Sequence, residues 1–229
     1  LASVPLGPAL EGIGPQCGRM AGPGSITRFE VSPLGLACHS VDGPLAAGAD
    51  VQGISATGYL SLLALLLRLG CLDADGHSRP PASPLARRVA PPPQQARTGL
   101  RLPLPYGQWL AAADVEELLK VKAAFSQALE ALLRAAGLAA ADVACLALAG
   151  ALGEHCPPAC LEELGFLPSG MGRRVRAVGN SSLDGAALLA AEPWRLPALA
   201  RWCAAATLVP VAEDPGFHAD YLRHMRFGV

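Results

Sequence analysis

Neither sign of charge dominates this chain of 229 residues. It has 18 lysines and arginines against 19 aspartates and glutamates, a formal net charge of −1, and only 16% charged residues. A protein that binds nucleic acid through a broad surface needs clustered lysine and arginine side chains. We therefore expect no nucleic-acid partner. Hydrophobic residues make up 52% of the chain, which is enough to bury a substantial core.

Long apolar runs are also missing. The apolar stretch Leu62–Leu69 is far shorter than the roughly 20 residues that a membrane-spanning helix needs. Residues 1–20 have neither the basic start nor the long apolar core of a signal peptide. We therefore expect no membrane association and a cytoplasmic location. The chain begins without a methionine, so we also expect its natural N-terminus to lie upstream.

The cysteines follow no disulfide or metal pattern. There are 7, an odd number, and most stand singly in apolar surroundings, which is typical of a reducing compartment. The closest pair, Cys156 and Cys160, lacks the second pair that finger-like metal sites have. We predict no metal site in this chain, although metal binding through this pair stays a weaker alternative.

A catalytic set is likewise missing. The 5 histidines are scattered, and no spacing indicates a nucleophile–base pair. Glu11 is the only acidic residue before Glu30, and it lies among glycines. It is the one candidate for a catalytic role, as a carboxylate that positions metal or water; a surface acid in a turn is the alternative.

Two strand–turn–helix units are present instead. In the first, the apolar run Val143–Leu148 ends in Ala-Gly-Ala-Leu-Gly at 149–153. In the second, a strand at Arg173–Val178 leads into Gly179 and then a helix at Leu183–Ala191. Small residues let another group approach the backbone closely, and ligands bind at such turns in open α/β sheets. A tight turn without a ligand is the alternative.

Two helices have clear signals. Gly53–Gly58 opens an apolar helix at Tyr59–Leu69, which Ser55 or Thr57 can cap, and its glycine-flanked start could also bind an anion. A second helix is predicted from a cap at Asp114 to Ala136, ending at Gly137. Its lysines 120 and 122 cannot face alike, so one of them could point away from solvent, although a solvated face is usual for a lysine.

The remaining elements are shorter. The sequence predicts strands at Ser25–Val31, Leu34–Val41, Leu100–Leu104 and Leu208–Val211, a proline-rich loop at about 77–99, a short helix at Ala159–Leu164, and a final helix with Phe217, Tyr221 and Met225 as its apolar stripe.

Several blocks, in order, resemble one family. They are GPALEG (7–12), PGSI (23–26), GISATGYLSLLALLLRLGCLDADG (53–76), DVEELLKVKAAFSQALEALL (114–133), LALAGALGEH (146–155), LGFLP (164–168), VGNSSLDGA (178–186) and DPGFHADYLRHMRF (214–227). The chain is similar to the C-terminal part of the ATP-dependent reductive activators of corrinoid proteins. These belong to the superfamily of actin, sugar kinases and heat-shock chaperone ATPases (ASKHA), and the resemblance covers nearly the whole chain.

The resemblance implies an RNase-H-like, actin-like α/β lobe with a mixed sheet flanked by helices. It implies that the two glycine-lined bends, after residues 148 and 178, lie side by side and hold the adenosine of ATP or ADP bound with Mg²⁺. The residues that match the family's nucleotide site are Ala149, Gly150, Ala151, Gly153, Gly179, Asn180, Lys122, Thr57 and Gly58.

The resemblance also implies a function for the intact protein. It would hydrolyse ATP to drive an electron from an iron–sulfur cluster to the inactive cobalt of a partner, which is a corrinoid protein or a corrinoid-dependent methyltransferase. A homodimer is compatible with this function. The upstream phosphate-binding lobe and the cluster-bearing ferredoxin domain are absent from residues 1–229, so we expect this chain to be inactive alone. A non-catalytic nucleotide-sensing or partner-docking module is the alternative.

Two departures from the family pattern affect the expected nucleotide site. The family's Gly-Ser-Gly helix start is Ala56-Thr57-Gly58 here, and the phenylalanine of its adenosine turn is Leu152. Both could alter how the nucleotide fits.

Overall fold

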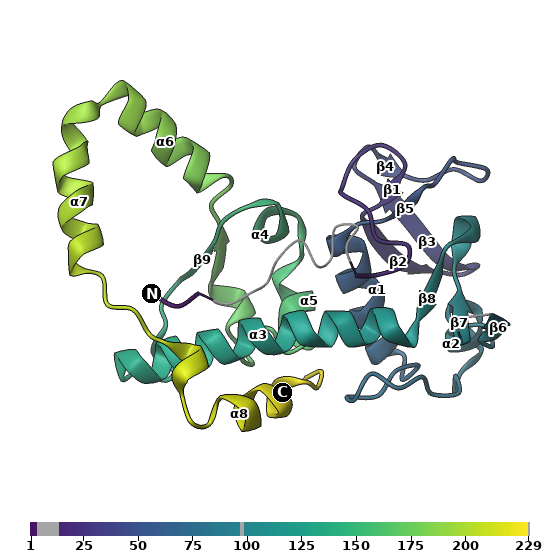
Figure 1. The fold of residues 1–229 in the computed structure, drawn as a ribbon. Coiled ribbons are helices and arrows are strands. Elements are labelled where there is room, and N and C mark those ends of the chain that lie inside the picture. The colour runs from purple at the N-terminus through teal and green to yellow at the C-terminus, as the bar shows by residue number, and fades with distance from the viewer. Residues whose placement is uncertain (4–13, 97–98, 229) are drawn as a thin grey trace.

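The computed structural model describes residues 1–3, 14–96 and 99–228. Helices and short strands alternate along the chain, and the longest helix, α3 (Ala112–Ala136), runs across the lower part of Figure 1 with α8 (Phe217–His224) lying beside it. Beta hairpins gather at one end of α3, and the helices α6 (Ser181–Ala191) and α7 (Leu196–Ala205) arch away from the other. The predicted α/β class is confirmed.

The core is built around α1 (Ala56–Arg68). Its side chains Tyr59, Leu60, Leu62 and Leu63 are fully buried, because apolar residues surround this helix on nearly all sides. The Ser55 hydroxyl accepts the N–H of Gly58 at 3.2 Å, so Ser55, of the two residues considered, is the N-cap. The predicted start and end of this helix are therefore correct to within a few residues.

The strands form four small sheets. Two are parallel pairs, one of β1 (Ser25–Ile26) with β5 (Gly53–Ile54) and one of β9 (Leu146–Leu148) with β10 (Val175–Ala177). The other two sheets are antiparallel. One consists of β2 (Arg28–Ser32), β3 (Gly35–Ser40) and β4 (Gly43–Pro44). The other consists of β6 (Gln94–Ala96), β7 (Gly99–Pro103) and β8 (Trp109–Ala111). Both directions occur, as expected of a mixed sheet, but in the described residues they are divided among separate sheets.

The start of α3 differs from the prediction. The helix begins at Ala112, and Asp114 lies in its first turn instead of capping it. The Asp114 carboxylate accepts the backbone N–H groups of Ala111 and Gln16, each at 2.9 Å. A buried acid can therefore tie the helix start to a segment 98 residues earlier, which no local capping rule predicts. The end at Gly137 is as predicted, with φ of 65°.

The predicted strand at Leu208–Val211 is wrong. This segment is irregular and leads into a 3₁₀ turn at Val211–Glu213. The N–H of Val209 donates to the carbonyl of Leu1 at 2.7 Å, but Pro210 has no N–H to continue a ladder. The loop at 77–99 also contains a short helix, α2 (Pro84–Val89), and the strand β6.

Among the described residues, no helix is both long enough and apolar enough to cross a bilayer. α6 and α7 contain no buried residue, and Leu183, Leu188, Leu196, Leu199 and Trp202 in them are exposed.

The loop that leads into β10 is held by one carboxylate. Glu162, in α5 (Pro158–Glu163), accepts the N–H groups of Gly170 at 2.6 Å and Gly172 at 2.9 Å. These two amides hold the pKa of Glu162 below its usual range. Because the second glycine bend follows β10, this carboxylate helps to hold the loop through which the chain enters that strand and bend.

We expect Glu162→Gln to lower the free energy of unfolding at pH 7 by about 1–2 kcal/mol. A carboxyl group with a depressed pKa stabilises the fold above its unfolded pKa and loses that contribution as the pH falls through its folded pKa. Urea unfolding should therefore show that the difference in unfolding free energy between wild type and Glu162→Gln is smaller in acid than at pH 7. Glu163→Gln, which removes only an exposed pair with Arg68, is the control and should cost less than about 1 kcal/mol. A gap that is unchanged in acid would contradict the assignment.

Candidate nucleotide site

The two glycine bends lie side by side. β9 and β10 are parallel neighbours, with Leu148 opposite Ala177. Beyond the strands, the N–H of Val178 donates to the carbonyl of Leu148 at 3.0 Å, and the N–H of Gly150 donates to the carbonyl of Gly179 at 2.8 Å. The predicted adjacency of the bends is therefore confirmed.

The backbone of both bends is open. Gly150 and Gly179 have φ of 85° and 59°, and a β-carbon on either would meet no other atom within 4 Å. Glycine is favoured at such left-handed positions, and no atom of the described residues occupies the space where a β-carbon would point. A flat group such as a nucleoside base can therefore lie against the backbone here, so the residues present fit an adenosine.

The neighbouring predicted residues have different surroundings. Ala149 is exposed at the bend, and Asn180, also exposed, caps α6 by accepting the N–H of Leu183 at 3.1 Å. Gly153 lies in the short helix α4 (Ala151–His155), where a β-carbon would come within 2.6 Å of the Leu148 Cβ. The structure gives Gly153 a packing role between α4 and β9, and its contact with nucleotide stays a prediction. Ala151, at the start of α4, follows directly on the open bend.

A hollow of about 540 Å³, a volume that suits a small ligand, lies where α4 ends. It lies between the β2–β3 hairpin, the start of α1 and His155, and its lining residues are Ala21, Thr27, Arg28, His39, Ser40, Val41, Gly43, Ser55, Ala56, Thr57 and His155. Because α4 has only 5 residues, its two ends are about 7 Å apart. The open bends and this hollow are therefore close enough for one extended ligand to reach both.

The charges at the hollow are partly neutralised. Glu30 accepts from Arg28 at 3.1 Å and lies 3.0 Å from the His39 Nε2. The Thr57 hydroxyl lies 2.9 Å from the Ser55 hydroxyl at the start of α1. A helix N-terminus with two hydroxyls and basic groups nearby favours a polar or anionic group of moderate charge.

Gly58 and Thr57 are neighbours in α1 but have different surroundings and different roles. Thr57 lines the hollow, whereas a β-carbon on Gly58 would lie 2.4 Å from the carbonyl oxygen of Ile26. Gly58 thus lets α1 pack directly on β1, and the described contacts give it no surface for a ligand.

Lys122 is buried inside the protein. Its Nζ donates to the backbone carbonyls of Arg226 at 2.7 Å and His224 at 3.1 Å, and the side chain is fully buried. Burial lowers the pKa of this amine to about 8, with a smaller contribution from the charge of Arg223. The structure therefore gives Lys122 a role in fastening the C-terminal segment to α3. These contacts lend no support to a contact with nucleotide, which stays a prediction.

Comparison with known proteins decides the family. Residues 1–228 match the profile of a family described as the C-terminal domain of RACo, the ASKHA domain. The chain belongs to this family. A corrinoid activation enzyme, RamQ of Eubacterium limosum, is 26% identical over 237 residues, a match covering 100% of this chain and 39% of the relative.

The fold of this ASKHA domain matches a solved structure. A reductive activator for corrinoid, iron–sulfur protein aligns with a TM-score of 0.83 and 23% identity, over 99% of this chain and 36% of that one. At this identity the likeness establishes the fold. The chain spans less than two fifths of the length of either relative.

The cysteines of this ASKHA domain gain no support as metal ligands. Cys156 is 3% exposed, and burial raises its pKa to about 12; burial also raises the pKa of Cys160. A metal ligand must be a thiolate, which both environments disfavour. In the part of the chain that is described, neither cysteine belongs to a cluster of three or more ligating side chains, and the cysteines there are free.

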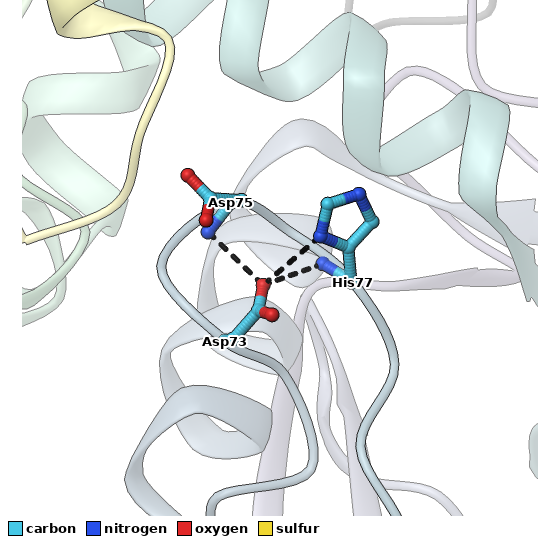
Figure 2. Close-up of side chains that lie close together, drawn as sticks. All are labelled: Asp73, Asp75 and His77. Atoms are coloured by element: carbon cyan, nitrogen blue, oxygen red, sulfur yellow. Dashed lines mark hydrogen bonds and ion pairs between the residues drawn. The ribbon is translucent and has the colours of Figure 1, made fainter.

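Sequence analysis did not single out one cluster of potential ligands, Asp73, Asp75 and His77, although the letters DADGH contain it. Figure 2 shows the Asp73 carboxylate accepting backbone N–H groups, from Asp75 at 3.0 Å and from His77 at 2.8 Å. Its other oxygen accepts from Arg79 at 2.7 Å. The Asp75 carboxylate points away in Figure 2 and accepts from Arg226 at 2.7 Å. The contacts of Asp73 stabilise the turn at 73–77, and the pair between Asp75 and Arg226 connects this turn to the C-terminal segment.

Glu11, the candidate catalytic carboxylate, lies outside the described residues.

Proposed function

We propose that this ASKHA domain forms part of the nucleotide-binding cleft of an ATP-dependent activator, which drives reduction of the inactive corrinoid cobalt of a partner protein. The pair of hydrogen-bonded, open glycine bends supports the nucleotide site, since it fits an adenosine. The names of the relatives, a corrinoid activation enzyme and a reductive activator, support the reaction. The partner would be a corrinoid protein or a corrinoid-dependent methyltransferase.

Each residue would have a simple task. The open backbone at Gly150 and Gly179 receives the base and ribose, and the Asn180 side chain lies at the edge of the second bend. The Thr57 hydroxyl and the start of α1 provide donors on the side of the hollow. Bound ATP with Mg²⁺ would supply the free energy of phosphate cleavage. A nucleotide that prefers one arrangement of the protein shifts the populations of its conformations, which is how binding here could change affinity for a partner.

This domain would act as one component of a larger protein. Phosphate-binding loops of an upstream lobe and a ferredoxin-type iron–sulfur cluster would complete the pathway from ATP to cobalt. Residues 1–229 would therefore bind nucleotide without turning it over.

The test is whether the glycine bends bind nucleotide. We expect the 229-residue chain to bind ADP or ATP with Mg²⁺ in isothermal titration calorimetry, and Gly179→Leu to abolish the signal by placing a side chain over the bend. Gly137→Leu is the matched control, because Gly137 has nearly the same φ, 65° against 59°, and equally open surroundings but ends α3 far along the chain. Both changes should lower stability similarly, by about 1–2 kcal/mol. Equal loss of binding in both variants, or retention in both, would contradict the site.

A non-catalytic nucleotide-sensing or partner-docking module is the second candidate. Tight nucleotide binding by a full-length protein that shows no ATP hydrolysis with its corrinoid partner would favour this candidate over an activase.

A further inference from the structure

A second cavity, of about 310 Å³, lies where α3, α8 and the 3₁₀ turn at Val211–Glu213 meet. Figure 1 shows α8 lying beside α3. The volume is close to the lower limit of sites that bind small molecules. None of the described residues that line this cavity belongs to the glycine bends or to the hollow at the start of α1. The cavity is therefore separate from the candidate nucleotide site.

Two aromatic rings of α8 line the cavity. Phe217 and Tyr221 are four residues apart, so they lie on one face of the helix. Their ring centroids are 6.1 Å apart, and their planes are 23° from parallel. The Tyr221 hydroxyl donates to the backbone carbonyl of Lys120 at 3.3 Å, which holds this ring against α3. Val121 and Ala124 add apolar surface from α3. Such walls favour a flat, apolar ring system.

A buried amide also lines the cavity. Gln127, on α3, is only 4% exposed, and its Nε2 donates to the backbone carbonyl of Phe217 at 2.8 Å. A carbonyl oxygen can only accept, so this bond assigns the amide nitrogen to that side and the amide oxygen to the other. The Gln127 Oε1 has no hydrogen-bond partner among the residues that the structure describes. A buried acceptor without a donor is unfavourable, so a donor supplied by a ligand would be stabilising.

The charged side chains at the cavity are already paired. Lys120 and Glu117 line it, and the Lys120 Nζ lies 2.9 Å from the carboxylate of Glu117 and 3.1 Å from that of Glu116. Two acids share this one ammonium group, so an anionic ligand would be repelled. All three side chains are well exposed to solvent, so a cation would gain little there. An uncharged ligand is therefore favoured.

We propose that this cavity binds a small, uncharged, flat heteroaromatic molecule of one or two fused rings that carries a ring N–H group. The ring lies against Phe217 and Tyr221, and its N–H donates to the Gln127 Oε1. A ligand bound in this way contacts both α3 and α8, so it holds the C-terminal helix on α3. The proposal does not depend on the nucleotide site.

Two related ligands test the proposal on the 229-residue chain. Indole is the probe, because it has two fused rings and one N–H donor, and 1-methylindole has the same rings without the donor. In NMR titrations we expect indole to shift the ring resonances of Phe217 and Tyr221, and to bind roughly 10-fold more tightly than 1-methylindole. The absence of saturable indole binding, equal binding of the two ligands, or shifts confined to other residues would overturn the proposal.

Gln127→Met separates the hydrogen bond from the fit of the ring. Methionine keeps the length of the side chain but lacks the amide acceptor, so the preference for indole should disappear in this variant. Gln95→Met, at an exposed glutamine of β6, is the matched control and should keep the preference. A preference that persists in Gln127→Met would overturn the proposal. Thermal unfolding followed by circular dichroism checks that each variant is folded, and the comparison of the two ligands on the wild-type chain tests the proposal without any variant.

Discussion

Replacing Gly58 by alanine is expected to destabilise the protein by about 2–4 kcal/mol, although alanine is the better helix former. The added β-carbon would lie 2.4 Å from the carbonyl oxygen of Ile26 and 2.8 Å from the Ile54 Cγ2. Ile26 and Ile54 are completely buried and belong to the paired strands β1 and β5. The clash is with backbone and a locked core side chain, so α1 would have to move off the sheet.

Gly185→Ala is the matched control for this substitution. Gly185 also lies within a helix, α6, but its β-carbon would meet no atom within 4 Å. The same chemical change should there raise the free energy of unfolding by up to about 1 kcal/mol, because alanine restricts the unfolded chain more than glycine does. Chemical denaturation of the two variants side by side measures both effects. Similar losses at both positions would show that α1 does not pack on β1 as closely as the structure has it.

Lys122→Met is expected to cost about 2–4 kcal/mol, the second large effect. Methionine keeps the length and the apolar stem of the side chain but removes the donor, which leaves the carbonyls of His224 and Arg226 without this partner. An unsatisfied buried acceptor loses the hydrogen bond that water would give it in the unfolded chain. The C-terminal segment should therefore loosen first, which amide hydrogen exchange of α8 can follow.

Lys120→Met is the control, two residues away on the same helix. Lys120 is 43% exposed and pairs with Glu116 at 3.1 Å and Glu117 at 2.9 Å. Exposed pairs contribute little, so the loss should stay below about 1 kcal/mol. Equal effects of the two lysine substitutions would contradict the buried placement of Lys122.

The effect of Lys122 should also depend on pH. Its folded pKa, about 8, lies below that of a lysine in an unfolded chain, so the unfolded state binds more protons above pH 8. The contribution of this group to stability therefore rises with pH through that window. The difference in unfolding free energy between wild type and Lys122→Met should therefore increase from neutral pH into the alkaline range. Comparing the two proteins at each pH cancels the titration of the cysteines and tyrosines, and a gap that narrows would refute the pKa direction.

Much of the fold follows from local signals. The leucines of α1 and its serine cap are close together in the sequence. The glycine that ends α3 directly follows that helix, and the hairpin of β2 and β3 is formed by neighbouring strands. The two strand–glycine turn–helix units could be found because each consists of consecutive residues. Their adjacency followed from the family resemblance and is confirmed by the bond between Gly150 and Gly179.

Other features depend on residues far apart in the sequence. Leu208–Val211 has the composition of a strand, but a strand also needs a neighbour, and among the described residues Leu1 supplies only two hydrogen bonds here, one to the carbonyl of Thr207 and one from the N–H of Val209. The helix α7 was not predicted, because its prolines and small residues give weak signals and its apolar side chains find no core. Asp114 was predicted to be the N-cap of α3, but its carboxylate accepts the N–H of Ala111 from within the first turn and also that of Gln16, a partner 98 residues away that no local signal indicates.

The sequence by itself determined the helices with strong periodicity and caps, the positions of the glycine bends and, through its motifs, the family. Only the tertiary structure decided that Lys122 is buried among carbonyls of the C-terminal segment, that Gly58 and Gly153 serve packing, and that α6 and α7 contribute no buried residue to the core. The physical reason is the range of the interactions. Caps, turns and periodicity act within a few residues, whereas burial and the pKa of an amine depend on atoms brought together from distant parts of the chain.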